Sequence, residues 1–237
     1  MMRREVTIDA RFKGPPASGN GGYSCGVLAE AIEGVATVRL RVPPPLDTQM
    51  TLEGDGASGR LSHGDLVIGE AEGDFLDLST PEPPSLAQAN EAVPRYRGFE
   101  GHPFPECFVC GPDRQPGDGL RLFTGRVAGS DLVASPWIPD ETLTDGSGAI
   151  DRRSVWAALD CPSYFAIETA PPALLASLTA DISRVPAPGE QLVAYGWHRH
   201  SEGRKHYCGS GLATPEGEIV ARAAALWIEP RAVAAPH

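Results

Sequence analysis

Residues Asp151–Ala166 read DRRSVWAALDCPSYFA, a short apolar pattern of helical type that carries a single carboxylate, Asp160, in its second half. The residues around this acid are apolar or weakly polar: Trp156, Ala157, Ala158, Leu159 and Cys161. A lone acid in such a run is costly to bury unless it is paired or has a chemical use. Pro162 predicts that the helix kinks or ends near Asp160–Cys161. Asp160 is therefore the first candidate for a functional residue.

A second stretch, Gly19–Ile32 (GNGGYSCGVLAEAI), is the counterpart of the first in the N-terminal half. It follows a loop rich in Gly, Pro, Ser and Asn, and its apolar residues Val27, Leu28, Ala31 and Ile32 share one helical stripe. We interpret the two stretches as facing helices of a duplicated fold, with chemistry between them.

Most of the remaining chain shows strand patterns, and two segments of it recur. VPPPLDTQMTLEG (Val42–Gly54) echoes VPAPGEQLVAYG (Val185–Gly196), and HGDLVIGEA (His63–Ala71) echoes EGEIVARAA (Glu216–Ala224). Each half has the order strand, loop, helix and antiparallel strands, which predicts an α+β unit whose sheet wraps the helix. We predict one repeat over residues 1–78, a Pro-rich linker over 79–106 and a second repeat over 107–237.

Individual strands follow from period-two alternation. The clearest are predicted at Val6–Phe12, Ala36–Val42 and Lys205–Ala213, with a hairpin formed by Leu120–Val127 and Ser130–Pro136.

The composition excludes several classes of protein. The 237 residues carry 20 basic and 31 acidic side chains, and the resulting net charge of -11 argues against a nucleic-acid partner. No apolar run approaches the roughly 18 residues of a membrane span, and the N-terminus MMRREVTIDARF has no apolar signal region. Five scattered cysteines fit a reduced cytoplasm better than a disulfide framework. We therefore expect a cytoplasmic protein with no membrane or nucleic-acid partner.

Three segments together resemble a known family. CFVCGPDRQPGDGLRLF (Cys107–Phe123) resembles the N-terminal signature of hotdog-fold acyl-CoA thioesterases. GNGGYSCGVLAEAI and AALDCPSYFA resemble the central helices of double-hotdog, medium-chain members, and the closing strands from Val185 onward resemble the hotdog sheet. The resemblance implies an α+β double hotdog, in which two antiparallel sheets or one continuous sheet wrap two central helices.

The chain also departs from this family at two places. Asn20 stands where many single-hotdog members have His before the Gly-Gly pair. The last strands carry Ala223–Ala225 and no counterpart of the Gln found in some double-hotdog enzymes.

The implied activity is hydrolysis of an acyl-CoA or a related acyl thioester, with Asp160 as general base or nucleophile. Gly21, Gly22 and Tyr23 would begin the first helix and offer backbone N–H groups to the developing oxyanion. Asn20 would add a hydrogen bond or cap that helix. The competing interpretation of this loop is an ordinary Gly-rich helix start, and Asp160 would then only cap a turn.

Substrate binding is predicted at two further places. Arg199, Arg204 and Lys205 share a hairpin tip with His198 and His200, and such a tip suits the phosphates of coenzyme A. A solvated hairpin explains the same residues equally well. Gly21 and Trp156 are predicted to contact the rest of the substrate. The pseudo-equivalent site, where Glu30 would face Asp151–Ser154, carries Arg152 and Arg153 in place of glycines, so we expect it to be structural.

Cys107 and Cys110 form a CxxC pair, which is half of a zinc knuckle. His102 would bring the number of ligands only to three, and Cys25, Cys161 and Cys208 look isolated. We expect a tight turn with buried thiols, no metal, and no cofactor apart from coenzyme A as part of the substrate.

Other functions remain open at this stage. A hotdog module that binds an acyl ligand without catalysis is the main alternative. A hydratase is disfavoured, because hydratases of this fold carry a His five residues after an Asp, and no Asp here has one. Pairing of sheet edges, common in the fold, favours a homodimer, although a double hotdog already contains its own pseudo-dimer.

Overall fold

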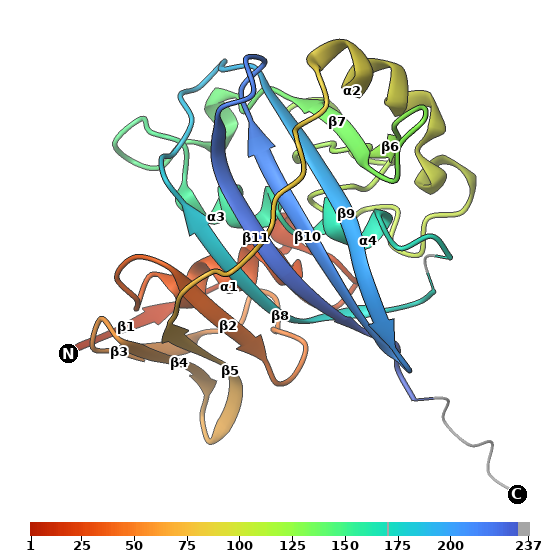
Figure 1. The fold of residues 1–237 in the computed structure, drawn as a ribbon. Coiled ribbons are helices and arrows are strands. Elements are labelled where there is room, and N and C mark those ends of the chain that lie inside the picture. The colour runs from red at the N-terminus through yellow and green to blue at the C-terminus, as the bar shows by residue number, and fades with distance from the viewer. Residues whose placement is uncertain (170, 232–237) are drawn as a thin grey trace, which may run out of the picture.

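An antiparallel sheet of eleven strands runs through the whole computed structural model (Figure 1). The structure describes residues 1–169 and 171–231, so residues 232–237 of the predicted second repeat lie outside the described residues. Across the sheet the strand order is β1-β3-β4-β5-β2-β8-β11-β10-β9-β7-β6. The strands are β1 Met2–Val6, β2 Ala36–Leu40, β3 Met50–Gly54, β4 Ser58–His63, β5 Leu66–Gly73, β6 Gly125–Arg126, β7 Val133–Trp137, β8 Leu174–Ile182, β9 Leu192–Glu202, β10 Lys205–Ala213 and β11 Ile219–Ile228.

The two halves of the chain join at the β2–β8 pair, where Thr37 lies opposite Thr179 and their hydroxyl oxygens are 2.6 Å apart. Outward from this pair, the first half has the order β2-β5-β4-β3-β1 and the second half β8-β11-β10-β9-β7. The segments that echo each other in sequence thus occupy equal places, β3 with β9 and β5 with β11. The predicted α+β double hotdog is confirmed, in the form with one continuous sheet.

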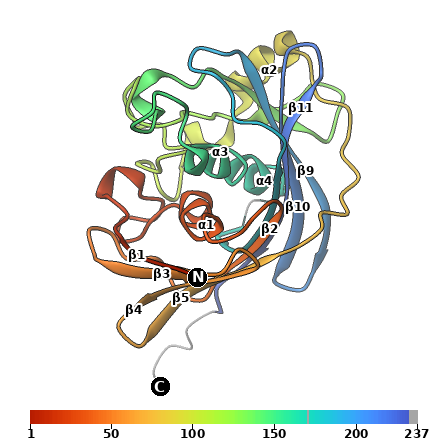
Figure 2. The same ribbon diagram turned by 90° about the vertical axis from the view of Figure 1, so that its left-hand side faces the viewer.

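Three helices lie against one face of this sheet (Figure 2). They are α1 Gly21–Ala29, α3 Arg152–Ala158 and α4 Cys161–Phe165, and a fourth helix, α2 Leu86–Ala92, packs near β6 and β7. Helix α1 is buried from Gly22 to Leu28, as its almost uniformly apolar sequence requires. Among the described residues, no helix is both long and apolar enough to span a membrane.

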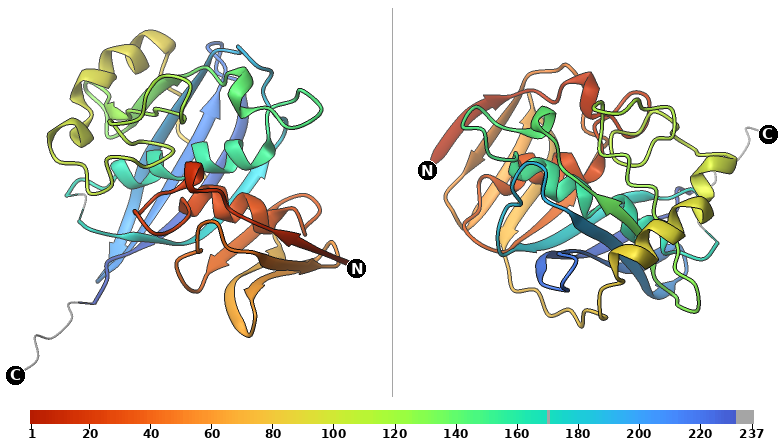
Figure 3. Two further views of the ribbon diagram at one scale, coloured as in Figure 1. Left: turned by 180° about the vertical axis from the view of Figure 1, so that it is seen from behind. Right: turned by 90° about the horizontal axis from the view of Figure 1, so that it is seen from above.

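Glycines let α1 and α3 approach closely, and the two helices lie side by side when the molecule is seen from behind (Figure 3). A Cβ atom on Gly22 would lie 2.5 Å from Cβ of Asp160, and one on Gly26 would lie 2.8 Å from Cα of Arg153. Because the later glycine meets the earlier residue of the partner, the helices run antiparallel. The close crossing brings Asp160 to the N-terminus of α1.

The predicted linker is more ordered than we expected. Residues 79–106 contain α2, which begins with a capping box between Ser85 and Gln88, and two short 3-10 helices, Val93–Arg95 and Arg97–Glu100. Just before it, Leu76 and Leu78 pack with Val193 and Tyr195 of β9. The chain crosses the face of the sheet opposite the central helices there (Figure 1). Prolines hide this order in the sequence, because periodicity is lost while apolar contacts remain.

At two places the observed strands differ from the predicted ones. Val6–Phe12 was expected to be one strand, but β1 ends at Val6 and Ala10–Phe12 forms a 3-10 turn capped by Asp9, whose carboxylate accepts the Arg11 N–H at 2.7 Å. The hairpin expected from Leu120 to Pro136 is reduced to the short β6 and β7. The N–H groups of Leu120 and Leu122 bind the carbonyls of Phe108 and Val109 instead.

The helix crossing predicts a specific sensitivity at Gly26. In Gly26→Ala the new methyl group meets the backbone of α3, and overpacking of this kind costs about 1–3 kcal/mol. That cost outweighs the helix-propensity gain of about 1 kcal/mol. Gly146→Ala is the matched control, because a Cβ there has nothing within 4 Å. Chemical denaturation should show a loss of stability only in Gly26→Ala, and equal stability of the two variants would contradict the close crossing.

Candidate active site

Asp160 sits at the break between α3 and α4, where the sequence predicted a kink or an end. Serine side chains donate to the backbone carbonyls on both sides of this break. Ser210 Oγ donates to the carbonyl of Leu159 at 2.6 Å, and Ser163 Oγ donates to the carbonyl of Asp160 at 2.6 Å. Trp227 in turn donates its indole N–H to Ser163 Oγ at 2.8 Å. Residues of strands β10 and β11 therefore hold the backbone around Asp160 in place.

The carboxylate of Asp160 is held across the helix crossing by two donors. Its Oδ2 accepts the Nδ2 hydrogen of Asn20 at 2.7 Å and the backbone N–H of Gly22 at 3.0 Å. Asp160 is only 1% exposed, and its Oδ1 has no hydrogen-bond partner among the described residues. Buried polar atoms are seldom left unpaired, so one oxygen of Asp160 is positioned and the other marks this carboxylate as a candidate for a functional role.

Burial raises the pKa of Asp160 to about 7, against the opposing effect of the Gly22 hydrogen bond. The charge of Cys107 raises this pKa further, and the hydrogen bond from Asn20 lowers it. A carboxyl group with a pKa near neutrality is suited to general acid–base catalysis, because it both accepts and returns a proton.

Asn20 has a fixed orientation because both ends of its side-chain amide are in use. Its Oδ1 caps α1 by accepting the N–H of Tyr23 at 2.9 Å, so its Nδ2 must face Asp160. The side chain is buried, and its backbone N–H donates to the carbonyl of Phe12 at 2.8 Å. The expected helix cap is present, and the same side chain also donates to Asp160.

A cavity of about 760 Å³ reaches Asp160, Asn20 and Gly21. This volume lies within the range of small-molecule sites. Side chains with large apolar surfaces form much of the remaining wall: Leu40, Val42, Phe104, Tyr164, Phe165, Leu175 and Trp227. Arg41, Arg204 and Glu229 also line it. The cavity thus joins a polar end at the helix crossing to walls suited to a hydrocarbon or aryl group.

The predicted oxyanion donors differ in what they can still bind. The N–H of Gly22 is used by Asp160, and that of Tyr23 by the cap of Asn20. The ring of Tyr23 is buried and stacks on Phe12 with centroids 3.9 Å apart, so Tyr23 is part of the core. Gly21 lines the cavity, and its N–H has no acceptor within the described residues.

Some of the residues predicted to contact the substrate line the cavity, and others do not. Arg204 lines the cavity, where it donates to the carbonyl of Glu229 at 2.5 Å. Arg199 and Lys205 are exposed and do not line it. Trp156 is also absent from the wall, because it is buried in α3 against Gly26. A large apolar residue near a predicted site is as easily a core residue, and Trp156 is one.

The second, pseudo-equivalent position is an ion pair. Glu30 faces α3 as predicted, and its carboxylate contacts the guanidinium groups of Arg153, at 3.0 Å, and Arg4. Asp151 caps α3 and also pairs with Arg153, at 3.1 Å. These paired charges agree with the expected structural role.

The cysteines were only partly understood from the sequence. Cys161 was taken as isolated, but its sulfur lies 3.9 Å from that of Cys107. Cys107, Cys110 and Cys161 all line the cavity. A contact of this kind depends on the tertiary fold, and the only local signal was that Cys161 directly follows Asp160.

Comparisons with known proteins support the fold. No family model matches the sequence, and no curated protein matches it. A structure from Thermobifida fusca YX, named as a candidate thioesterase II, is 17% identical with a TM-score of 0.63, and the match covers 97% of this chain and 94% of that one. A tesB protein from Mycobacterium avium subs paratuberculosis is 12% identical with a TM-score of 0.59, covering 96% and 92% of the two chains.

A third structure is described as a conserved protein of unknown function with a hot dog fold, from Alicyclobacillus acidocaldarius. It is 11% identical with a TM-score of 0.62, and the match covers 98% of this chain and 94% of that one. At such identities the likeness shows the fold alone, and the chain has the double hotdog fold over nearly its whole length.

The dual role of Asn20 predicts that two substitutions will differ. Asn20→Ala removes both the helix cap and the donor to Asp160, whereas Asn20→Ser keeps a good capping oxygen and removes only the donor. Loss of a cap costs about 1 kcal/mol, so Asn20→Ala should be less stable than Asn20→Ser by about that amount. Urea unfolding measures the difference, and identical midpoints would show that the Oδ1 bond to Tyr23 does not cap α1.

Proposed function

We propose that the protein is a thioesterase that hydrolyses an acyl-CoA or a related acyl thioester at Asp160. One observation carries the proposal: a buried carboxylate at the end of an apolar cavity has one oxygen held by Asn20 and Gly22 and the other unpartnered. Similarity in fold to a candidate thioesterase II and to a tesB protein supports the same activity.

Hydrolysis at this site would use Asp160 as the base. Its Oδ1 takes a proton from a water molecule while the water oxygen bonds to the thioester carbonyl carbon. The C–S bond then breaks, its electron pair leaves with the sulfur, and Asp160 returns the proton to that sulfur. The products are a carboxylic acid and a free thiol. Asp160 could instead attack the carbonyl carbon itself, in which case water hydrolyses the resulting anhydride.

The developing oxyanion needs a donor on the opposite side of the carbonyl carbon. The N–H of Gly21 supports this role best, because it is at the first residue of α1, beside the cavity, and has no acceptor among the described residues. Donors at a helix N-terminus also carry the positive end of the helix dipole. The N–H of Gly22 holds Asp160, and the N–H of Tyr23 holds the cap of Asn20. Of the three N–H groups expected to bind the oxyanion, we therefore assign that role to Gly21 alone.

The walls of the cavity support an acyl or aryl group of substantial size, and Arg204 supports a phosphate-bearing carrier. A guanidinium group at the cavity edge suits the phosphates of coenzyme A. Arg41 also lines the cavity, but its guanidinium is paired with Glu70 at 2.6 Å. Among the described residues, the guanidinium of Arg204 has no partner but the carbonyl of Glu229, and it is the cation that we assign to the carrier.

The first test replaces the base with its isosteric amide. In Asp160→Asn the amide oxygen can still accept from Asn20 and Gly22, but the side chain cannot take a proton. We expect thiol release from a panel of acyl-CoA and aryl-CoA thioesters to fall by roughly 10²-fold or more, with no loss of folding stability. Asp151→Asn is the matched control, because Asp151 caps α3 away from the cavity wall and its loss should leave turnover nearly unchanged.

Two outcomes would contradict the assignment. Full turnover in Asp160→Asn would exclude Asp160 as base or nucleophile. A wild-type protein that binds acyl-CoA without cleaving any member of the panel would favour the non-catalytic ligand-binding module.

A second test separates coenzyme A from other carriers. Arg204→Gln should raise KM for an acyl-CoA by roughly tenfold, the effect of losing one hydrogen bond to a charged group. KM for the corresponding N-acetylcysteamine thioester, which lacks the nucleotide, should not change. Arg199→Gln, on the same hairpin but away from the cavity, serves as the control. Equal KM changes for both substrates in Arg204→Gln would refute a phosphate contact at this residue.

A further inference from the structure

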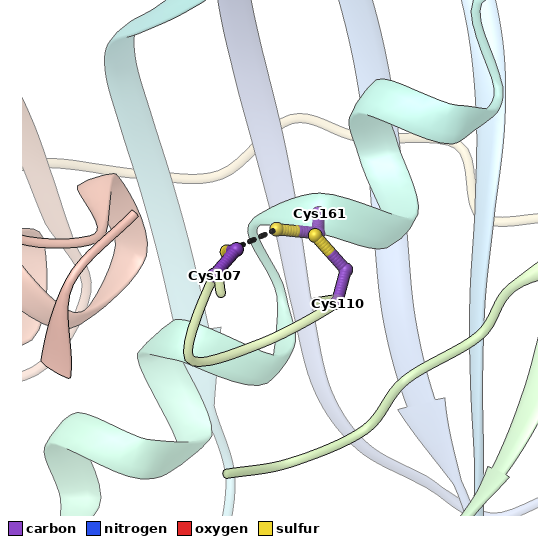
Figure 4. Close-up of side chains that lie close together, drawn as sticks. All are labelled: Cys107, Cys110 and Cys161. Carbon is purple, nitrogen blue, oxygen red and sulfur yellow. Dashed lines mark hydrogen bonds between the residues drawn. The ribbon is translucent and has the colours of Figure 1, made fainter. Parts of the chain in front are cut away.

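Three thiols converge beside the candidate active site. Cys107 and Cys110 come from one loop and Cys161 from the first residue of α4 (Figure 4). Their sulfur atoms all lie within 4.8 Å of one another, and Cys107 and Cys161 are 3.9 Å apart. All three side chains are buried. Cys25 and Cys208, also buried, are not part of this group.

The loop that carries Cys107 and Cys110 is a tight turn. The N–H of Gly111 donates to the carbonyl of Cys107 at 2.9 Å, and a Cβ at Gly111 would lie 2.4 Å from the carbonyl oxygen of Pro105. Only glycine allows the turn to close in this way.

We propose that Cys107, Cys110 and Cys161 bind a thiophilic divalent cation, of which zinc is the representative. With Zn–S bonds of about 2.3 Å, two sulfurs of a tetrahedral site lie about 3.8 Å apart. The observed Cys107–Cys161 separation of 3.9 Å agrees with that spacing. This site replaces the expectation from the sequence that the CxxC pair binds no metal, because the fold supplies the third thiol that the sequence did not reveal.

His102 supports the site as a hydrogen-bond donor. Its Nδ1 accepts the backbone N–H of Phe104 at 2.9 Å, so the ring proton of the neutral imidazole is on Nε2. Nε2 lies 3.2 Å from the sulfur of Cys110 and therefore donates to it. Such contacts to the sulfur of a ligand position it and tune the metal site.

Asn20 adds a second donor to the cluster. Its Nδ2 lies 3.8 Å from the sulfur of Cys107 and 4.0 Å from that of Cys161. These donors offset part of the negative charge that three thiolates leave on a divalent ion. Because the three cysteines and His102 all line the cavity, the fourth position is left to a water or a ligand from the cavity, as in zinc sites that keep an open position.

Metal content tests the proposal directly, and it does so independently of any thioesterase activity. Protein purified under reducing conditions from zinc-supplied cells should contain one zinc ion per chain by inductively coupled plasma mass spectrometry. Cys110→Ala and Cys161→Ala should each lose most of this zinc. The matched controls Cys25→Ala and Cys208→Ala remove buried thiols outside the cluster, and they should keep it.

Cobalt provides a readout that needs no variant to fold. Anaerobic addition of Co²⁺ to the reduced, metal-stripped wild-type protein should give thiolate-to-cobalt charge-transfer bands that stoichiometric zinc abolishes. Absence of these bands, together with no retained zinc, would overturn the proposal. Equal zinc content in the cluster variants and the controls would overturn it as well, because the metal would then be bound elsewhere.

Discussion

The hydrogen bonds from Asn20 and Gly22 to the carboxylate of Asp160 are the interaction on which the candidate site depends. They join residues 138 and 140 positions apart in the chain, and they exist only because α1 and α3 cross without side chains between them. A methyl group at Gly22 would overlap with Asp160 itself. The same glycine thus provides both the space and one of the two donors. Without those donors the buried carboxylate would have no polar partner, a costly arrangement at 1% exposure.

The continuous sheet explains why this crossing is held so firmly. Helix α1 precedes β2 and helix α3 precedes β8, and β2 and β8 are paired at the centre of the sheet. The two helices therefore lead toward neighbouring strands and lie against one face of the sheet. Hydrogen bonds from Ser210 of β10 and Trp227 of β11 then hold the break at Asp160 against the sheet. The geometry of the candidate site is a consequence of the joined halves, since each half alone carries only the loop or only the acid.

Local signals were sufficient to predict the parts of the site that depend on neighbouring residues. Pro162 indicated the break after α3, and the Asn-Gly-Gly run indicated the start of α1, where Asn20 indeed caps the helix. The duplication in turn predicted that Asp160 and Gly22 meet. The burial of the Tyr23 and Trp156 side chains could not be predicted, because a buried aromatic residue and a ligand contact look alike in a single sequence. Tyr23 stacks on Phe12 and Trp156 packs against Gly26, and these contacts follow from the tertiary fold.

The sequence also could not show that Cys161 joins the CxxC turn, since the residues are more than fifty positions apart. The same limit applies to the segment around Leu76 and Leu78. Apolar contacts to β9 hold this segment against the outer face of the sheet. Patterns that repeat along the chain were predictable, and contacts made by irregular segments were not, because they follow from packing rather than from period.

The two ends of the α1–α3 crossing have opposite chemistry. At one end an acid is buried beside glycine and asparagine, with one oxygen unpartnered. At the other end Glu30 is part-exposed and paired with two arginines. An acid whose charge is neutralised by fixed cations has a poor proton affinity and no room for a ligand. An acid held by neutral donors keeps its proton affinity and leaves room for a ligand. Its burial, however, is unfavourable for folding. The helix pair carries that cost at one end only, because Glu30 at the other end is in an ion pair.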